Sequence, residues 1–264
     1  MNNTFNPRRF GLLLKKTLLE RPVQMFGFTG MLLALVLILY VVAKSIMGFN
    51  GAQNLTFIWG LAGGSCFLAS FVFNYFSSNA IGSSYLTLPA SHFEKWLCGI
   101  IVVGVFYPVI FMIFYRVIDA SFVSIFHKSL DPAAPFYKQQ YESVYLFPFN
   151  GIIAWKVYPL FLLLTGAMLI GSLYFNKVGF IKTAIVICVL CLACYGLNWL
   201  SAKLLFGNIS DAGPFSHVSI PVGKEEGSID LPETAARFFD ANLQFIFPGM
   251  LWILAFIRLR EKEF

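Results

Sequence analysis

Long windows without a charged residue alternate along the chain with short charged segments. A transmembrane helix needs about 20 predominantly apolar residues to cross the hydrocarbon core. The windows are 22–43, 45–93, 96–115, 157–176, 183–202 and 241–257. The second is longer than the rest, and its apolar centre lies at roughly 56–76. The pattern predicts six transmembrane helices, at about 23–43, 56–76, 97–118, 156–176, 181–203 and 241–257.

Composition gives the same interpretation. Hydrophobic residues make up 58% of the chain and charged residues 12%, and Phe occurs 30 times. Soluble domains carry roughly a quarter charged residues. We therefore expect an all-α membrane protein with one transmembrane domain over residues 1–264. The net charge of +6 lies beside apolar spans, so it indicates membrane topology and not a nucleic-acid partner.

The distribution of charge predicts the orientation. Six spans place both termini on the same side of the membrane. With the termini inside, the inner segments carry 11 basic and 4 acidic residues, and the outer segments carry 8 and 9. Basic residues concentrate on the cytoplasmic side of membrane proteins. We therefore predict cytoplasmic N and C termini, a location in the cytoplasmic (inner) membrane, and two long outer loops near 120–152 and 204–239.

The segment 4–21 is predicted to form a separate amphipathic helix. Asn6 is a suitable N-cap, and Pro7 occupies the first helical position, where its missing N–H is tolerated. The cations of its polar face are Arg8, Arg9, Lys15 and Lys16. A helix of this kind is expected to lie on the inner leaflet with its cations near anionic lipid. The alternative is a simple basic anchor for the first span.

Small residues in the second span predict close helix packing. Gly60 and Gly64 form a G-x-x-x-G pattern, which lets helix backbones approach closely in lipid. The packing partner can be another helix of the same chain or a second copy. Cys188, Cys191 and Cys194 lie in an apolar run without histidine or carboxylate neighbours, so we expect them to pack between helices and not to bind metal.

A search for catalytic chemistry finds no complete set of groups. The sequence has no H-E-x-x-H motif and no phosphate-binding loop. No carboxylate falls inside a predicted span, and Arg116 and Asp119 are expected at the membrane interface at the outer end of the third span. We therefore predict no enzymatic activity, cofactor site or metal site in this chain, and a proton- or sodium-driven carrier is disfavoured.

The loop between the second and third spans carries the most distinctive local pattern. Ser91 and Glu94 form an S-x-x-E capping box, and Pro89 ends the preceding segment, so a helix should begin at about His92. An apolar group before it is expected to be exposed on the cytoplasmic side: Tyr85, Leu86 and Leu88. Such a patch suits docking of a protein partner. The alternative is a turn that rests on neighbouring helices.

Taken together, these features resemble the permease subunits of type-2 ABC exporters. The resemblance covers the basic N-terminal helix, six spans, the first cytoplasmic loop and the re-entry before the last span. The string SSYLTLPASHFEKWL also resembles a segment that follows the second span in bacterial permeases of this kind. The outer loop before the sixth span departs from the family, in which short re-entrant helices are usual.

The resemblance implies that ATP hydrolysis occurs on separate ATPase subunits, which pair with two permease copies or homologues. It also implies that the first cytoplasmic loop couples the ATPase to the membrane helices. Carried onto this chain, the coupling residues are Tyr85, Leu86, Leu88, Pro89, Ser91, Glu94, Lys95 and Trp96. A membrane scaffold that transports nothing is the alternative function.

Overall fold

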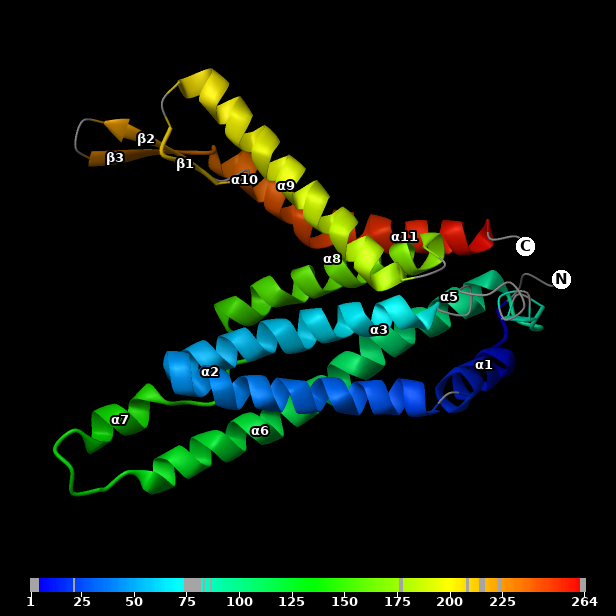
Figure 1. Cartoon of the computed structure of the whole chain (residues 1–264), viewed down its shortest axis with the longest axis horizontal. Helices are drawn as coiled ribbons and strands as arrows, with labels where there is room; N and C mark the ends of the chain where they lie inside the picture. The colour runs from blue at the N-terminus through cyan, green and yellow to red at the C-terminus, as the bar shows by residue number, and fades with distance from the viewer. Residues whose placement is uncertain are drawn as a thin grey trace.

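The computed structural model describes most of the chain as long helices that lie side by side (Figure 1). The described residues are 5–20, 22–73, 82, 84–85, 87–175, 178–207, 209–213, 217–222 and 225–261. Five helices in this part of the chain are long and apolar enough to cross a membrane. They are Met25–Val72, His92–Ser129, Ile152–Tyr174, Gly179–Phe206 and Glu233–Arg260. The structure therefore supports a helical membrane protein.

Several of these long helices consist of α-helical pieces joined by single π-helical turns. The described α-helices, separate or joined in this way, are α1 (Pro7–Leu19), α2 (Phe28–Ile58), α3 (Gly64–Val72), α5 (His92–Ile101), α6 (Tyr107–Ser129), α7 (Tyr137–Ser143), α8 (Ile152–Tyr174), α9 (Gly179–Phe206), α10 (Glu233–Ala241) and α11 (Phe247–Arg260). The π-helical turns are Val23–Gly27, Trp59–Gly63, Val102–Phe106 and Asn242–Ile246. Such turns widen a helix locally without ending it.

The first of the five helices reverses direction in its middle. Gly48 has φ 74° and ψ −173°, a conformation that glycine adopts without steric cost. The chain before and after Gly48 forms two limbs that lie side by side (Figure 1). Ring contacts join the two limbs, because Phe28 packs against Phe67 and Phe71 with centroid distances of 5.7 and 5.0 Å. Met25–Val72 is therefore a helical hairpin.

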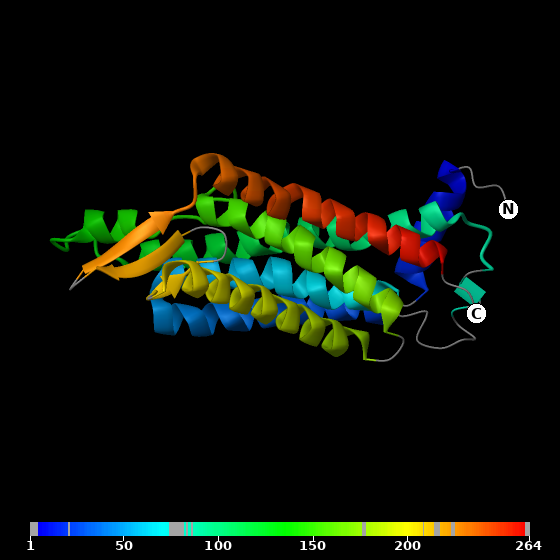
Figure 2. The ribbon, with the colours of Figure 1, turned by 90° about the horizontal axis from the view of Figure 1, so that it is seen from above.

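The elements divide between the two ends of the bundle. α1 and the last turns of α11 lie at one end, which we call the α1 end (Figures 1 and 2). α7 and the β-strands lie at the opposite end, which we call the α7 end. Near the α7 end, an aromatic cluster surrounds the fully buried Phe57 and includes Phe111, Tyr115 and Phe147. Near the α1 end, a second cluster joins α3, α8 and α11 through Leu169, Leu173 and Leu259, among others.

The all-α prediction is wrong for the segment before the last span. Three antiparallel strands lie there: β1 (Asp211–Ala212), β2 (His217–Val222) and β3 (Glu225–Asp230). β2 and β3 pair from His217 with Asp230 to Val222 with Glu225. Apolar residues alternate with polar ones at the start of β2, since Val218 and Ile220 share one face. That period of two residues favours a strand, and it was overlooked within a polar loop.

The third span is longer than predicted. The helix continues from His92 to Ser129, so the loop expected to start near 120 begins instead at Leu130. Asp119 consequently lies inside the helix, with no exposed surface, and not at its end. After the strands, α10 begins at Glu233, directly behind Pro232.

Candidate functional site

The start of α5 has the local structure that its sequence predicts. The backbone N–H of Glu94 donates to Ser91 Oγ at 3.2 Å, and the backbone N–H of Ser91 donates to Glu94 Oε2 at 2.8 Å. The capping box is therefore confirmed, and α5 begins at His92. Reciprocal bonds of this kind satisfy two N–H groups that a helix end otherwise leaves unpaired.

Glu94 also binds α1, which the sequence did not reveal. Its Oε1 accepts the backbone N–H of Asn6 at 2.8 Å and the Arg9 Nη2 group at 3.0 Å, and the Glu94 side chain is fully buried. Burial by itself raises the pKa of Glu94. The N–H groups of Asn6 and Ser91 and the Arg9 guanidinium favour the charged form, and together they hold the pKa below its usual range. This carboxylate thus joins two helices inside the protein.

The rest of α1 is amphipathic in the predicted sense. Asn6 caps it through bonds from the backbone N–H groups of Arg8 and Arg9 at 3.0 and 3.4 Å. Its buried side chains are Leu13 and Thr17, and the Cys98 thiol of α5 donates to Thr17 Oγ1 at 3.4 Å. The other cations of the polar face are exposed: Arg8, Lys15 and Lys16. α1 therefore packs on α5 and leaves a basic surface uncovered.

The expected exposure of the apolar group before α5 is wrong. Tyr85 is only 7% exposed and belongs to the cluster near the α1 end, and Leu88 is half-buried against the same cluster. Leu86 lies outside the described residues. Lys95 is also buried, and its ammonium lies 5.6 Å from the centre of the Tyr85 ring. Burial lowers the pKa of Lys95 to about 8, an effect that Glu94 opposes.

Exposed residues of this region include Thr87, Pro89 and Phe93. Only Pro89 of these three was among the predicted coupling residues, and the Phe93 ring also contacts Phe256 of α11. The half-buried Trp96 anchors α5 to α11, because its Nε1–H donates to the carbonyl of Trp252 at 2.9 Å and its ring contacts Phe256. A docking partner would therefore contact the exposed residues and not the buried charges of Glu94 and Lys95.

The small residues of the second limb pack within the chain. The Tyr107 hydroxyl donates to the Gly60 carbonyl at 2.6 Å. A methyl group added at Gly64 would collide with the Tyr107 ring, and one added at Gly60 would collide with Phe111. The partner of the G-x-x-x-G face is thus the helix His92–Ser129, which settles the choice between intrachain and second-copy packing at this face.

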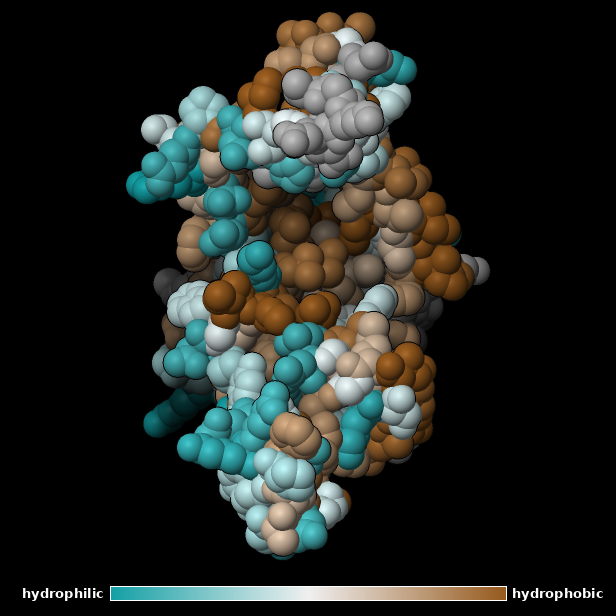
Figure 3. Space-filling view, turned by 90° about the vertical axis from the view of Figure 1, so that its left-hand side faces the viewer, coloured by the Kyte–Doolittle hydropathy of each residue, from teal (hydrophilic) through white to brown (hydrophobic). Residues whose placement is uncertain are grey.

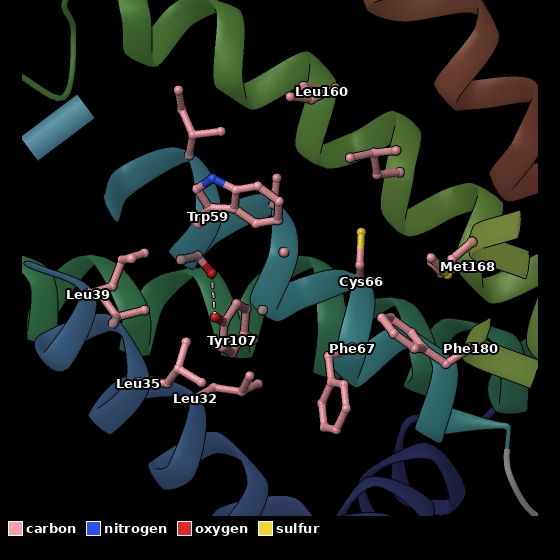
Figure 4. Close-up of a pocket in the computed structure, with 18 of the residues that line it drawn as sticks. Leu32, Leu35, Leu39, Trp59, Cys66, Phe67, Tyr107, Leu160, Met168 and Phe180 are labelled. Carbon is pink, nitrogen blue, oxygen red and sulfur yellow. Dashed lines mark hydrogen bonds between the residues drawn. The ribbon is translucent and has the colours of Figure 1, made fainter. Parts of the chain in front are cut away.

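A cavity of about 760 Å³ lies between the hairpin, α8 and α9 (Figure 4). Its wall includes Leu32, Leu35, Leu39, Trp59, Cys66, Phe67, Tyr107, Leu160, Met168 and Phe180. The wall is almost entirely apolar, and the Tyr107 hydroxyl hydrogen is already bonded to Gly60. Figure 3 shows a hollow with a hydrophobic interior when the molecule is viewed at the α7 end.

Two groups of residues lie where the sequence did not place them. Cys191 and Cys194 are exposed on α9 and do not pack between helices of this chain, whereas Cys188, also exposed, lines the cavity. Asp119 accepts three hydrogen bonds, from the Tyr40 hydroxyl, the Gln53 amide and the backbone N–H of Phe147. The sequence gave no sign that Asp119 meets these three donors, because none of them is close to it along the chain. No family model, curated protein or solved structure matches the chain.

Proposed function

We propose that this chain is the membrane-spanning permease subunit of an ABC transporter that exports a substrate across the bacterial cytoplasmic membrane. In this proposal the chain crosses the membrane six times, with both termini in the cytoplasm. Separate ATPase subunits supply the energy, and a second permease copy or homologue completes the complex. The resemblance of its sequence pattern to type-2 exporter permeases motivates the proposal.

The topology is supported by the hairpin at Gly48. It divides the helix Met25–Val72 into two limbs, so the five candidate helices provide six crossings. An even number of crossings fits the position of α1 and the end of α11 at the same end of the bundle (Figure 2). The excess of basic residues in the segments near that end favours the cytoplasm.

One observation carries the proposal. The helix His92–Ser129 begins beside the exposed surface at the α1 end and continues through the bundle towards the α7 end. The helix runs over 38 residues from His92 to Ser129 without ending, and its first turn is fixed by the capping box. A push on Thr87, Pro89 or Phe93 would therefore be transmitted along this helix, through its π-helical turn at Val102–Phe106, to the α7 end. Energy delivered by a partner at the cytoplasmic surface would reach the membrane cavity in this way.

Site-specific photo-cross-linking tests this function. Benzoyl-phenylalanine is introduced at Thr87 and, separately, at Phe93, both of which are exposed. We expect ultraviolet light to join each variant to an ATP-binding-cassette ATPase in native membranes. The matched control is the same label at Tyr141, which is exposed at the α7 end. The control should give no cross-link to the ATPase.

A second measurement separates the permease from the scaffold alternative. The purified complex of the chain with the captured ATPase should hydrolyse ATP, and the rate should fall in the variant Thr87→Trp, which enlarges the exposed surface without touching the capping box. Cross-links from Thr87 and Phe93 only to proteins without ATPase activity would contradict the proposal and support the scaffold.

A further inference from the structure

A groove of about 700 Å³ lies at the α7 end, between the last turns of α6 and the chain around the end of α7. A loop joins these two helices at that end of the bundle (Figure 1). The residues that line the groove are Ala120, Val123, Ser124, His127 and Lys128 from α6, and Tyr141, Glu142, Val144, Tyr145 and Leu146 from the other wall. Charged side chains are among them, so the groove can select a ligand by its charges.

The two walls of the groove are held together at two levels. His127 Nε2 lies 3.2 Å from the carbonyl oxygen of Tyr141 and 2.9 Å from that of Val144. Carbonyl oxygens only accept, so Nε2 carries a proton and donates to both. Further into the bundle, the backbone N–H of Phe147 donates to Asp119 at 2.7 Å. The chain from Tyr141 to Phe147 therefore runs antiparallel to α6 and is fixed to it.

Both walls change from apolar to polar in the same direction. On α6, Ala120, Ser124 and Lys128 are spaced four residues apart, so they form one stripe that ends in a cation. On the opposite wall, the antiparallel course of the chain places Leu146 at the level of the apolar end of the stripe and Glu142 at the level of its charged end. The groove thus has an apolar inner half and a charged outer half.

The two charged residues of the outer half are exposed and of opposite sign. In the part of the chain that the structure describes, no ion pair joins Lys128 or Glu142 to each other or to another residue. A ligand that carries both an anion and a cation can therefore bind both side chains through charge-assisted hydrogen bonds.

The length of the helix places this groove at the level of lipid head groups. The 38 residues from His92 to Ser129 span about 57 Å at 1.5 Å per residue, whereas a bilayer with its head groups is about 40–45 Å thick. The third span is expected to end near residue 118, so the stripe that begins at Ala120 starts at the edge of the hydrocarbon core. The exposed Tyr141 and Tyr145 fit this level, because aromatic side chains are common at membrane interfaces.

We propose that the groove binds a phospholipid whose head group carries both a phosphate and a primary amine, as that of phosphatidylethanolamine does. The phosphate lies beside Lys128, the ammonium lies beside Glu142, and the start of one acyl chain lies along the apolar inner half. That inner half favours a lipid over a free head group, which would leave it unfilled. In the proposed topology the lipid belongs to the outer leaflet. The site stands on the groove and does not require the permease function.

Photolabelling in nanodiscs tests the recognition of the head group. The full chain is reconstituted in equal amounts of phosphatidylethanolamine and phosphatidylglycerol, and one of the two lipids carries a diazirine near the start of its acyl chain. The labelled peptides are identified by mass spectrometry. We expect the ethanolamine probe to label the peptides that contain Ala120 and Leu146 about threefold more than the glycerol probe, the size of an exposed charge interaction. An excess of soluble glycerophosphoethanolamine should not reduce this labelling.

Charge variants separate the two contacts of the head group. Glu142→Gln should remove the preference for the ethanolamine probe, because phosphatidylglycerol has a phosphate but no amine. Lys128→Gln should lower labelling by both probes about threefold, because both lipids have a phosphate. The controls are Asp240→Asn and Lys138→Gln, which change exposed residues of α10 and α7 that do not line the groove, and both should label as the wild type does.

A pair of bulky variants tests the groove itself. Ser124 is an exposed residue of its wall, so Ser124→Trp should fill the groove and reduce labelling there severalfold. Ser121→Trp adds the same ring to an exposed site of α6 outside the groove and should leave labelling unchanged. Equal labelling by the two lipid probes, competition by the soluble head group, or unchanged labelling in Ser124→Trp would overturn the proposal.

The nanodiscs contain no ATPase and the same lipids in both leaflets, so the result depends neither on a captured partner nor on the orientation of the chain. Head-group preference without capture of an ATPase would keep the lipid site and reject the permease. Capture of an ATPase without head-group preference would keep the permease and reject the lipid site.

Discussion

Two buried carboxylates lie on the continuous helix His92–Ser129, and they are held in different ways. Glu94, at the α1 end, binds the Arg9 cation and the N–H groups of Asn6 and Ser91. Asp119, near the α7 end, accepts bonds from neutral donors at 2.9, 2.8 and 2.7 Å. Both side chains have no exposed surface. The first is an ion pair with a helix cap, and the second is a junction of three chain segments.

The difference indicates which end of the helix can move. Glu94 connects α5 to α1, and Arg9 is about a third exposed, so water and a partner can reach that contact. Asp119 joins both limbs of the hairpin, through Tyr40 and Gln53, to the loop at Phe147. Releasing it would leave three buried donors unpaired. We therefore expect the α7 end to be the fixed end and the α1 end to be the adjustable one.

The largest effect is expected from removing the junction at the α7 end. Asp119→Ala should lower the free energy of unfolding by about 2–4 kcal/mol, because the donors of Tyr40, Gln53 and Phe147 lose their acceptor, although hydrogen bonds in membranes contribute modestly one by one. Thermal unfolding in detergent measures this loss. Hydrogen exchange should rise at the backbone N–H of Phe147.

A matched control for that variant lies on the same helix. Ser121→Ala removes an exposed hydroxyl that bonds only to the carbonyl of Val117 in its own helix, and it should change stability little. Equal thermal midpoints for Asp119→Ala and Ser121→Ala would show that the junction does not hold the α7 end, and the comparison between the two ends would fail.

An intermediate effect is expected at the middle of the helix, where Tyr107 packs against the hairpin. Gly64→Ala places a methyl group against the Tyr107 ring and disturbs its bond to Gly60, so it should cost about 1–3 kcal/mol. Gly63→Ala is the control, since its methyl group would meet only Trp59 at 3.4 Å. Thermal unfolding of both variants in detergent provides the measurement.

The variants Gly64→Ala and Gly63→Ala also test whether motion at one end of the helix reaches the other end. If the helix transmits motion as one element, Gly64→Ala should raise hydrogen exchange at both the α1 end and the α7 end. A rise confined to the neighbourhood of Tyr107 would show that the ends are independent, and it would remove the basis for coupling through this helix.

Local signals in the sequence were sufficient where a contact joins near neighbours. Ser91 and Glu94 are three residues apart, and Asn6 caps the N–H groups of Arg8 and Arg9, so these contacts have recognisable patterns. The apolar windows likewise indicated the membrane helices, because an uninterrupted run of about 20 apolar residues is typical of a transmembrane helix. The functional roles of these residues stay predictions.

Contacts between distant segments had no such signal. Asp119 bonds to Tyr40 and Gln53, which lie 79 and 66 residues away, and nothing in the three residues themselves indicates that they meet. For the same reason the sequence showed that Tyr85 is apolar but not that other elements cover it. The two spans predicted at about 23–43 and 56–76 require a reversal between them, and Gly48 lies in that interval, but the sequence did not single out Gly48 as the turning residue.

The smallest effect is expected at the adjustable end. Glu94→Gln keeps one acceptor for the cap but removes the charge that pairs with Arg9, so at pH 7 it should cost about 1 kcal/mol. Hydrogen exchange should rise along α1 more than elsewhere, because α1 loses its ionic contact with α5. Glu20→Gln is the control. Glu20 is exposed, and its carboxylate lies 4.0 Å from the Lys16 ammonium of the same helix, so this ion pair does not join α1 to α5.

The dependence of this effect on pH follows from the lowered pKa of Glu94, which precedes the span expected to begin near 97. A carboxyl group whose pKa falls on folding stabilises the protein at pH values above its unfolded pKa of about 4.3, and that contribution is lost as the pH falls through the folded pKa. Wild-type α1 should therefore exchange faster below about pH 4. Glu94→Gln should show the faster exchange at every pH. An acid-dependent change of the same size in Glu94→Gln and wild type would show that another group controls the attachment of α1.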